Sequence, residues 1–108
     1  MAFQVSELSI QLVEALVPLM PRIKQRDKSL ADQLARAASS ISLNCGEAEF
    51  SDPGNKRARL FTAAGSAGQT RNALRLAVAW RIVRPTESEH ALRLLSRILA
   101  ILWRMTRG

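Results

Sequence analysis

The sequence has very few of the residues that form most small catalytic or metal sites. Its 108 residues include one cysteine, Cys45, and one histidine, His90. Single residues of these types cannot build a zinc cage, a disulfide framework or an intrachain cysteine pair. No tyrosine is present, and two tryptophans with three phenylalanines are too few to favour a base-stacking platform. We therefore expect no metal, no cofactor, no catalytic residues and no enzymatic activity.

Long apolar runs are also missing. The longest, residues 98–103, has six residues, whereas a helix needs about 20 to span a bilayer. The first residues lack the cationic start and the apolar stretch of a secretory signal. We expect one soluble cytoplasmic domain of bacterial type, residues 1–108, with no membrane partner.

Acidic residues are scarce in the second half of the chain. Residues 1–52 carry five basic and seven acidic side chains, a net charge of −2, whereas residues 53–108 carry eleven and two, a net charge of +9. Thirteen of the sixteen cations are arginines, whose planar fork suits phosphates and carboxylates. An anionic partner such as nucleic acid is therefore expected to bind the second half.

Hydrophobic periodicity predicts four long helices and no strand. The expected helices are residues 6–20, 29–50, 53–83 and 87–105, with a basic connector at 22–28. The expected N-terminal caps are Ser6, Ser29, Asp52 and a capping box of Thr86 with Glu89. Four long helices with short connections pack most simply as an all-α, up-down-up-down antiparallel four-helix bundle.

The fourth expected helix is apolar over more of its circumference than one core contact requires. On an ideal helix its apolar positions span about 200°, against about 100° for one core-facing stripe. The surplus predicts a second apolar surface, most economically an interface with another copy of the chain. Leu94, Ile101 and Trp103 are the expected interface residues.

Arginines provide the main candidate site. Arg93, Arg97 and Arg104 align within about 40° of one another on an ideal helix. Such a group would bind phosphates by charge and forked hydrogen bonds, with little sequence discrimination. The candidate nucleic-acid-binding residues are Arg57, Arg59, Arg75, Arg93, Arg97 and Arg104. The alternative is a solvated or interface face whose arginine stems cover apolar surface.

A second group of polar residues lies on the second expected helix. Ser40, Asn44 and Glu47 are spaced by four and three residues and therefore share one helix face. They could belong to a catalytic cleft, but no histidine or cysteine partner stands at motif spacing. We interpret them as a buried polar network that fixes helix register. Arg71 falls beside an apolar stripe, and we expect Glu47 to be its partner.

Two segments resemble a known bacterial family. They are residues 33–47, QLARAASSISLNCGE, and residues 58–66, ARLFTAAGS. The family pattern has Gln-Leu-x-Arg-Ala, then Ser-Ile-x-x-Asn-x-x-Glu-Gly, and later a Gly-Ser pair in the third helix. The chain is similar to the four-helix-bundle proteins encoded by intervening sequences in large-subunit ribosomal RNA genes. These include the accessory variability determinant of diversity-generating retroelements. Ala48 replaces the family's glycine, and Gln69 replaces an acidic residue.

The resemblance implies a barrel-like homopentamer. From the retroelement members only, it also implies binding to nucleic acid and to a reverse transcriptase through a basic surface. Together with the charge pattern, it favours an oligomeric, non-enzymatic protein that binds RNA or an RNA–DNA hybrid with little sequence specificity. The alternatives are a protein-interaction scaffold that docks a partner such as a reverse transcriptase, or a family member whose role is unassigned.

Overall fold

The computed structural model describes the backbone of residues 2–107 and the side chains of residues 4–107. Over this range the chain forms five helices and no strand: α1 (Ala2–Leu16), α2 (Met20–Arg26), α3 (Lys28–Glu49), α4 (Pro53–Ala79) and α5 (Pro85–Arg107). The all-α class is confirmed, but the expected count of four helices is wrong. The additional helix, α2, occupies most of the segment that we expected to be a basic connector.

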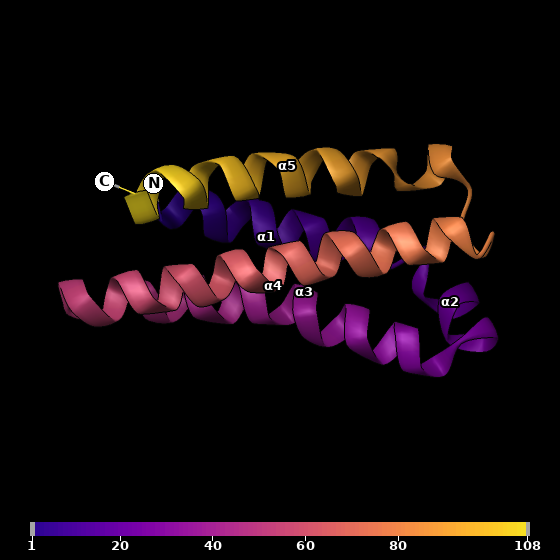
Figure 1. Cartoon of the computed structure of the whole chain (residues 1–108), viewed down its shortest axis with the longest axis horizontal. Helices are drawn as coiled ribbons and strands as arrows, with labels where there is room; N and C mark the ends of the chain where they lie inside the picture. The colour runs from indigo at the N-terminus through magenta and orange to yellow at the C-terminus, as the bar shows by residue number, and fades with distance from the viewer. Residues whose placement is uncertain (1, 108) are drawn as a thin grey trace.

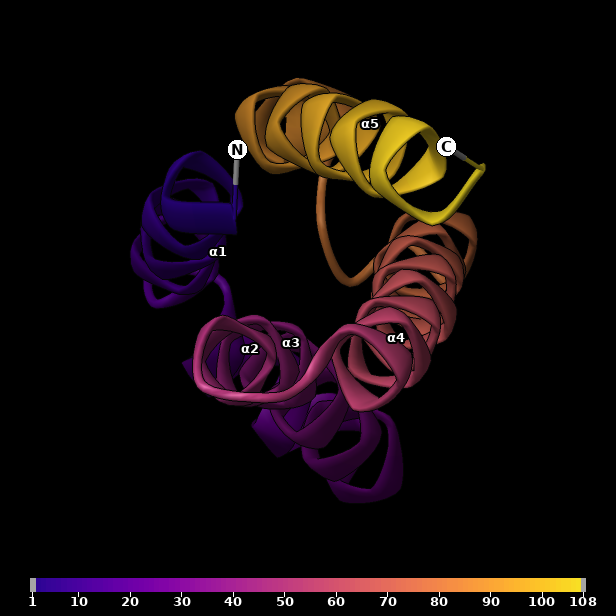
Figure 2. The same cartoon turned by 90° about the vertical axis from the view of Figure 1, so that its left-hand side faces the viewer.

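The four long helices surround one hydrophobic core, and each runs opposite to the one before it (Figure 1). Seen end-on, they form a ring in the order α1, α3, α4, α5, in which neighbours pack together and α5 closes on α1 (Figure 2). The short helix α2 packs on α3. The largest fully buried side chains include Leu12, Ile23, Leu34, Ile41, Leu74, Leu95, Ile98 and Leu102. No described helix is both long and apolar enough to cross a lipid bilayer.

The first helix lies earlier in the chain than its sequence pattern predicts. α1 begins at Ala2, so Ser6 is inside the helix and cannot be its cap. The helix ends at Leu16, before Pro18, and does not continue to Met20. Proline explains this end, because it has no backbone N–H and its ring clashes with the preceding turn of a helix.

Aspartates cap the two central helices. Asp27 accepts the backbone N–H of Leu30 at 3.0 Å, and α3 begins at the next residue. Asp27 therefore takes the role that we assigned to Ser29. Asp52 accepts the backbone N–H of Asn55 at 3.0 Å and is followed by proline, so the expected start of α4 is confirmed. The hydrogen bonds that Asn55 donates from its backbone and from its side chain hold the pKa of Asp52 below its ordinary value.

The third expected helix ends earlier than predicted. α4 stops at Ala79, whereas its pattern continued to Val83. Arg81 has a φ of 62°, in the left-handed region, and this conformation turns the chain away from the helix axis. Ile82 and Val83 are buried in the core. Their apolar character made the helical pattern look longer than the helix is.

The start of α5 also differs from its prediction. The helix begins at Pro85, and the structure has no hydrogen bond between Thr86 and Glu89. Glu87 makes the local contact instead, because its Oε1 accepts the backbone N–H of Arg84 at 2.9 Å. The carboxylate of Glu87 therefore takes the place of the expected capping box of Thr86 with Glu89.

Glu87 also connects α5 to α2. Arg22 of α2 donates from both terminal guanidinium nitrogens to the two carboxylate oxygens of Glu87, at 3.1 and 2.5 Å. The hydrogen bonds from Arg22, followed by the one from the Arg84 backbone, hold the pKa of Glu87 below its ordinary value of 4.5. The pair joins residues 65 positions apart in the sequence, so it helps to hold α2 in place.

Glu87→Gln should lower the melting temperature by a few degrees at pH 7. A carboxylate whose folded-state pKa is depressed stabilises the fold above its unfolded-state pKa, and this contribution is lost as the pH falls through the folded-state value. The difference between wild type and variant should therefore shrink between pH 5 and pH 3, as measured by circular dichroism. Glu89→Gln is the matched control, because its nearest arginine nitrogen is 4.0 Å away. An equal effect of both substitutions would contradict this assignment.

Candidate nucleic-acid interface

The outer face of α5 presents three of the candidate arginines. Arg93, Arg97 and Arg104 are all exposed, and spacings of four and seven residues return them to the same side of the helix. Arg93 has a long contact of 4.0 Å with Glu89, and both side chains are mostly exposed. Among the described side chains, no carboxylate lies within ion-pair distance of Arg97 or Arg104. Their charge is available to a partner.

Arg75 of α4 lies on the same side of the molecule. A hollow between α4 and α5 is lined by Arg75, Glu89 and Leu92, among others. A second hollow shares Glu89 and Leu92 and adds Arg93 and Arg97. Arg75, Arg93 and Arg97 therefore border one continuous surface, and Arg104 lies further along the same face of α5. We define the α4–α5 arginine surface as Arg75, Arg93, Arg97 and Arg104.

The other two candidate arginines are placed differently. Arg59 pairs with Glu47 of α3 at 3.0 Å, so its charge is partly compensated on the other side of α4. The Arg57 guanidinium lies over the ring of Phe61, 5.6 Å from its centroid. Arg57 also lines a hollow beside Met105, near the C-terminal end of α5. The structure therefore does not bring all six arginines into one site.

Two of the three expected interface residues are buried within the single chain, and one is exposed. Leu94 and Ile101 are each 4% exposed within a single chain, so they are not available to a second copy. The reason is that α5 packs on both α1 and α4, and two neighbours within the chain use the wide apolar arc. Trp103 remains 56% exposed. Its ring is covered by Arg107, whose Cζ lies 3.2 Å from the ring centroid.

A hydrogen-bond network links α3 to α4. The hydroxyls of Ser40 and Ser66 are 2.7 Å apart. Asn44 donates to the carbonyl and the hydroxyl of Ser40, at 2.9 and 3.1 Å, and Thr70 donates to the carbonyl of Ser66 at 2.7 Å. Ser66 and Thr70 were not among the residues expected in this network. The Gly-Ser pair of the second family-like segment was the only signal for Ser66.

Two expected members lie outside this network. Glu47 is paired with Arg59 instead of Arg71, and Arg71 is exposed to solvent. Angular positions on one ideal helix do not show which residue of a neighbouring helix is nearest. The expected Glu47–Arg71 pair is therefore replaced by a mainly exposed pair closer to the α3–α4 turn.

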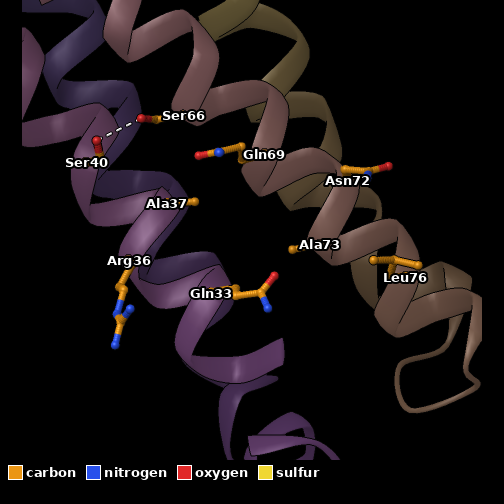
Figure 3. A pocket seen from close by; sticks show the side chains of 9 residues that line it. All are labelled: Gln33, Arg36, Ala37, Ser40, Ser66, Gln69, Asn72, Ala73 and Leu76. Atoms are coloured by element: carbon orange, nitrogen blue, oxygen red, sulfur yellow. Dashed lines mark hydrogen bonds between the residues drawn. The ribbon is translucent and has the colours of Figure 1, made fainter. Parts of the chain in front are cut away.

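A groove of about 410 Å³ lies between α3 and α4 (Figure 3). It is lined by Gln33, Arg36, Ala37, Ser40, Ser66, Gln69, Asn72, Ala73 and Leu76. Gln33 and Gln69 extend into the gap between the helices, whereas the Arg36 guanidinium points away from it (Figure 3). The lining contains no carboxylate, thiol or imidazole. It therefore provides hydrogen-bonding groups but no ordinary general acid or base.

The single thiol has low reactivity. Cys45 is fully buried on the core side of α3. Burial, with a smaller contribution from the negative charge of Glu49, raises the pKa of Cys45 to about 11. The thiol is therefore protonated at neutral pH and is a poor nucleophile. Within the described residues, no group of three or more histidine, cysteine or acidic side chains is arranged to hold a metal ion.

Comparison with known proteins gives one family and one fold. Residues 1–104 match the family described as 23S rRNA-intervening sequence protein. A crystal structure from Bacteroides thetaiotaomicron, described as a protein with unknown function from the S23 ribosomal protein family, superimposes with a TM-score of 0.87. It is 20% identical in sequence, and the match covers 96% of this chain and 99% of that chain. No curated protein sequence matches.

Proposed function

The chain belongs to the 23S rRNA-intervening sequence protein family, and from its arginine surface we propose that it binds nucleic acid without catalysing a reaction. The observation that carries this proposal is the group of arginines on α4 and α5, of which Arg97 and Arg104 have no carboxylate within ion-pair distance among the described side chains. The proposed ligand is RNA or an RNA–DNA hybrid.

Phosphate binding explains both the residue type and the position of these side chains. A guanidinium donates two parallel hydrogen bonds to a phosphate and remains charged at every physiological pH. Contacts to the phosphate backbone carry no direct information on base sequence. The α4–α5 arginine surface lies on two neighbouring helices, and Glu89 is the only acidic residue that lines its two hollows. We therefore propose binding with little sequence specificity.

We also propose that the protein works as an oligomer, with the barrel-like homopentamer of the family resemblance as the specific expectation. Large apolar side chains remain exposed on the single chain: Ile10, Val17, Leu43, Phe50, Phe61, Leu76, Trp80 and Trp103. Exposed aromatic side chains such as Phe50 and Trp103 are of the type that is enriched where two protein surfaces meet. Light scattering coupled to size exclusion gives the subunit number, and the mass of one chain would contradict this part of the proposal.

A protein-docking role is the second candidate function. Phe50 is 91% exposed and Leu43 is 66% exposed, and both lie on or next to α3, away from the arginine surface. These side chains favour an apolar contact with a protein. A reverse transcriptase is the partner that the family resemblance suggests. This role is compatible with nucleic-acid binding, because the two surfaces lie on different helices.

Fluorescence anisotropy across a salt series tests the proposed function. The probes are a single-stranded RNA, a duplex DNA and an RNA–DNA hybrid of equal length. If four arginines contact phosphates, the logarithm of the association constant should fall with the logarithm of salt concentration with a slope of about −3. Absence of binding to all three probes at low salt would end the proposal and would leave protein docking as the better explanation.

A further inference from the structure

The loop between α4 and α5 has an arginine at a position that requires a left-handed backbone but not an arginine side chain. The N–H of Ile82 donates to the carbonyl of Ala77, and the N–H of Arg81 donates to the carbonyl of Val78, both at 2.9 Å. This pair of hydrogen bonds is the Schellman arrangement, in which one residue must adopt the left-handed conformation. Arg81 is that residue, with a φ of 62°, at a position where glycine carries no steric cost.

The side chains of this loop divide into buried and exposed groups. Ile82 and Val83 are 8% and 1% exposed and fix the loop to the core. Trp80 is 67% exposed, and Arg81 and Arg84 are also exposed. The packing of the loop therefore uses only its two aliphatic residues. Trp80 and the two arginines are presented to solvent and are free for another role.

The ring of Trp80 is open, in contrast to that of the other tryptophan. Arg107 covers the ring of Trp103 at 3.2 Å, whereas no cation covers the ring of Trp80 among the described side chains. The sequence argument against base stacking used only the number of aromatic residues. That number does not show where the rings lie. An exposed indole face beside cations is the arrangement on which proteins stack an unpaired base.

The two arginines of this loop form no close ion pair with the nearest acid, Glu87, although its carboxylate interacts with the charge of Arg84. Arg81 and Arg84 line a shallow hollow of about 500 Å³ together with Val78, Ala79, Val83 and Pro85. Glu87 is held by Arg22 and by the backbone N–H of Arg84. No described carboxylate lies within ion-pair distance of the guanidinium of Arg81 or of Arg84. The hollow is therefore lined by two cations that have no close carboxylate partner among the described side chains.

We infer that Trp80, Arg81 and Arg84 form a site for one unstacked base and its adjacent phosphates in a single-stranded nucleic acid. The inference rests on the proposed nucleic-acid binding and specifies the form of the ligand. Trp80 stacks on the base, and the two arginines bind the phosphates on either side of it. A base pair inside a duplex does not offer its face to the indole, so this site favours single strands over duplexes.

Two substitutions in the full-length chain test the inference by anisotropy with a single-stranded oligouridylate and a duplex DNA of equal length. Trp80→Leu keeps an apolar side chain but removes the flat ring, and should weaken single-strand binding roughly 5- to 100-fold while leaving duplex binding unchanged. Trp103→Leu, a substitution of the other exposed tryptophan, is the matched control and should leave both affinities near the wild-type values.

Arg81→Gly separates a binding role from a structural one. Glycine relieves the left-handed strain, so the melting temperature should rise while the affinity for oligouridylate falls. In a Trp103→Phe background, the oligouridylate should also quench the fluorescence of Trp80, which is then the only tryptophan.

The outcomes distinguish this inference from the proposed function. Wild type that binds neither probe refutes the proposed function and the inference together. Tight single-strand binding that Trp80→Leu does not weaken overturns the inference and leaves the proposed function standing. Loss of binding that follows a change in subunit number, measured by light scattering, also overturns it, because Trp80 would then belong to a contact between copies.

Discussion

Replacing Arg93, Arg97 and Arg104 by glutamate should weaken nucleic-acid binding by on the order of a hundredfold at physiological salt. Each of these side chains is exposed on one face of α5, so the triple variant removes three of the proposed phosphate contacts and replaces them by repulsive charges. The salt dependence should become shallower at the same time, since fewer counterions are released on binding. Anisotropy at several salt concentrations measures both changes.

The control for this variant carries the same change in charge on the other side of the molecule. Lys24, Lys28 and Arg36 are exposed on α2 and α3, and Figure 2 shows α3 opposite α5. Their triple substitution by glutamate should reduce the affinity only slightly, through the net charge. Equal losses in the two variants would show that overall charge, and not the α4–α5 arginine surface, determines binding. Circular dichroism verifies that both variants keep their helices.

Leu34→Ala should lower the free energy of unfolding by about 3 kcal/mol, within the range of about 2–5 kcal/mol for a buried leucine. Leu34 is 0% exposed and lies in the core beneath α3. Truncation removes its apolar contacts and leaves a cavity that the neighbouring helices fill only in part. Urea unfolding followed by circular dichroism gives the value, and a loss below about 1 kcal/mol would contradict the position of Leu34 in the core.

Leu43→Ala is the matched control on the same helix. Leu43 is 66% exposed, so within one chain its truncation should change the free energy of unfolding by less than about 0.5 kcal/mol. A larger loss that grows with protein concentration would mean that a second copy covers Leu43, because association stabilises the folded chain by mass action. The pair of variants therefore measures the core and the subunit contact in one experiment.

Patterns that depend on neighbours in the sequence were predicted well. Leu30, Leu34, Ile41 and Cys45 of α3 are buried, at the helical spacing on which the prediction of residues 29–50 as a helix depends. The start of α4 at Asp52 followed from a capping residue placed before proline. The family resemblance, drawn from the second and third expected helices, is confirmed over residues 1–104. Each of these signals is contained in a few consecutive turns of chain.

The failures involve contacts between distant parts of the chain. Nothing near α2 in the sequence predicts a helix, because proline and charged residues dominate it and only Ile23 is buried. Its bond to Glu87 joins positions far apart in sequence. The apolar arc of α5 was real, but the pattern could not show that α1 and α4 cover it. Glu47 pairs with Arg59 and not with the expected Arg71 for the same reason: the pattern of one helix does not show which residue of the next helix is nearest.

The order of the helices around the ring has a consequence for the speed of encounter with a polyanion. α1 and α3 adjoin each other, as do α4 and α5 (Figure 2), so the half of the chain with net charge −2 and the half with net charge +9 lie on opposite sides. Such a separation gives the molecule a permanent electric dipole across its narrow dimension. In the field of a polyanion, this dipole orients the α4–α5 arginine surface toward the polyanion before contact. The orientation raises the association rate at low ionic strength.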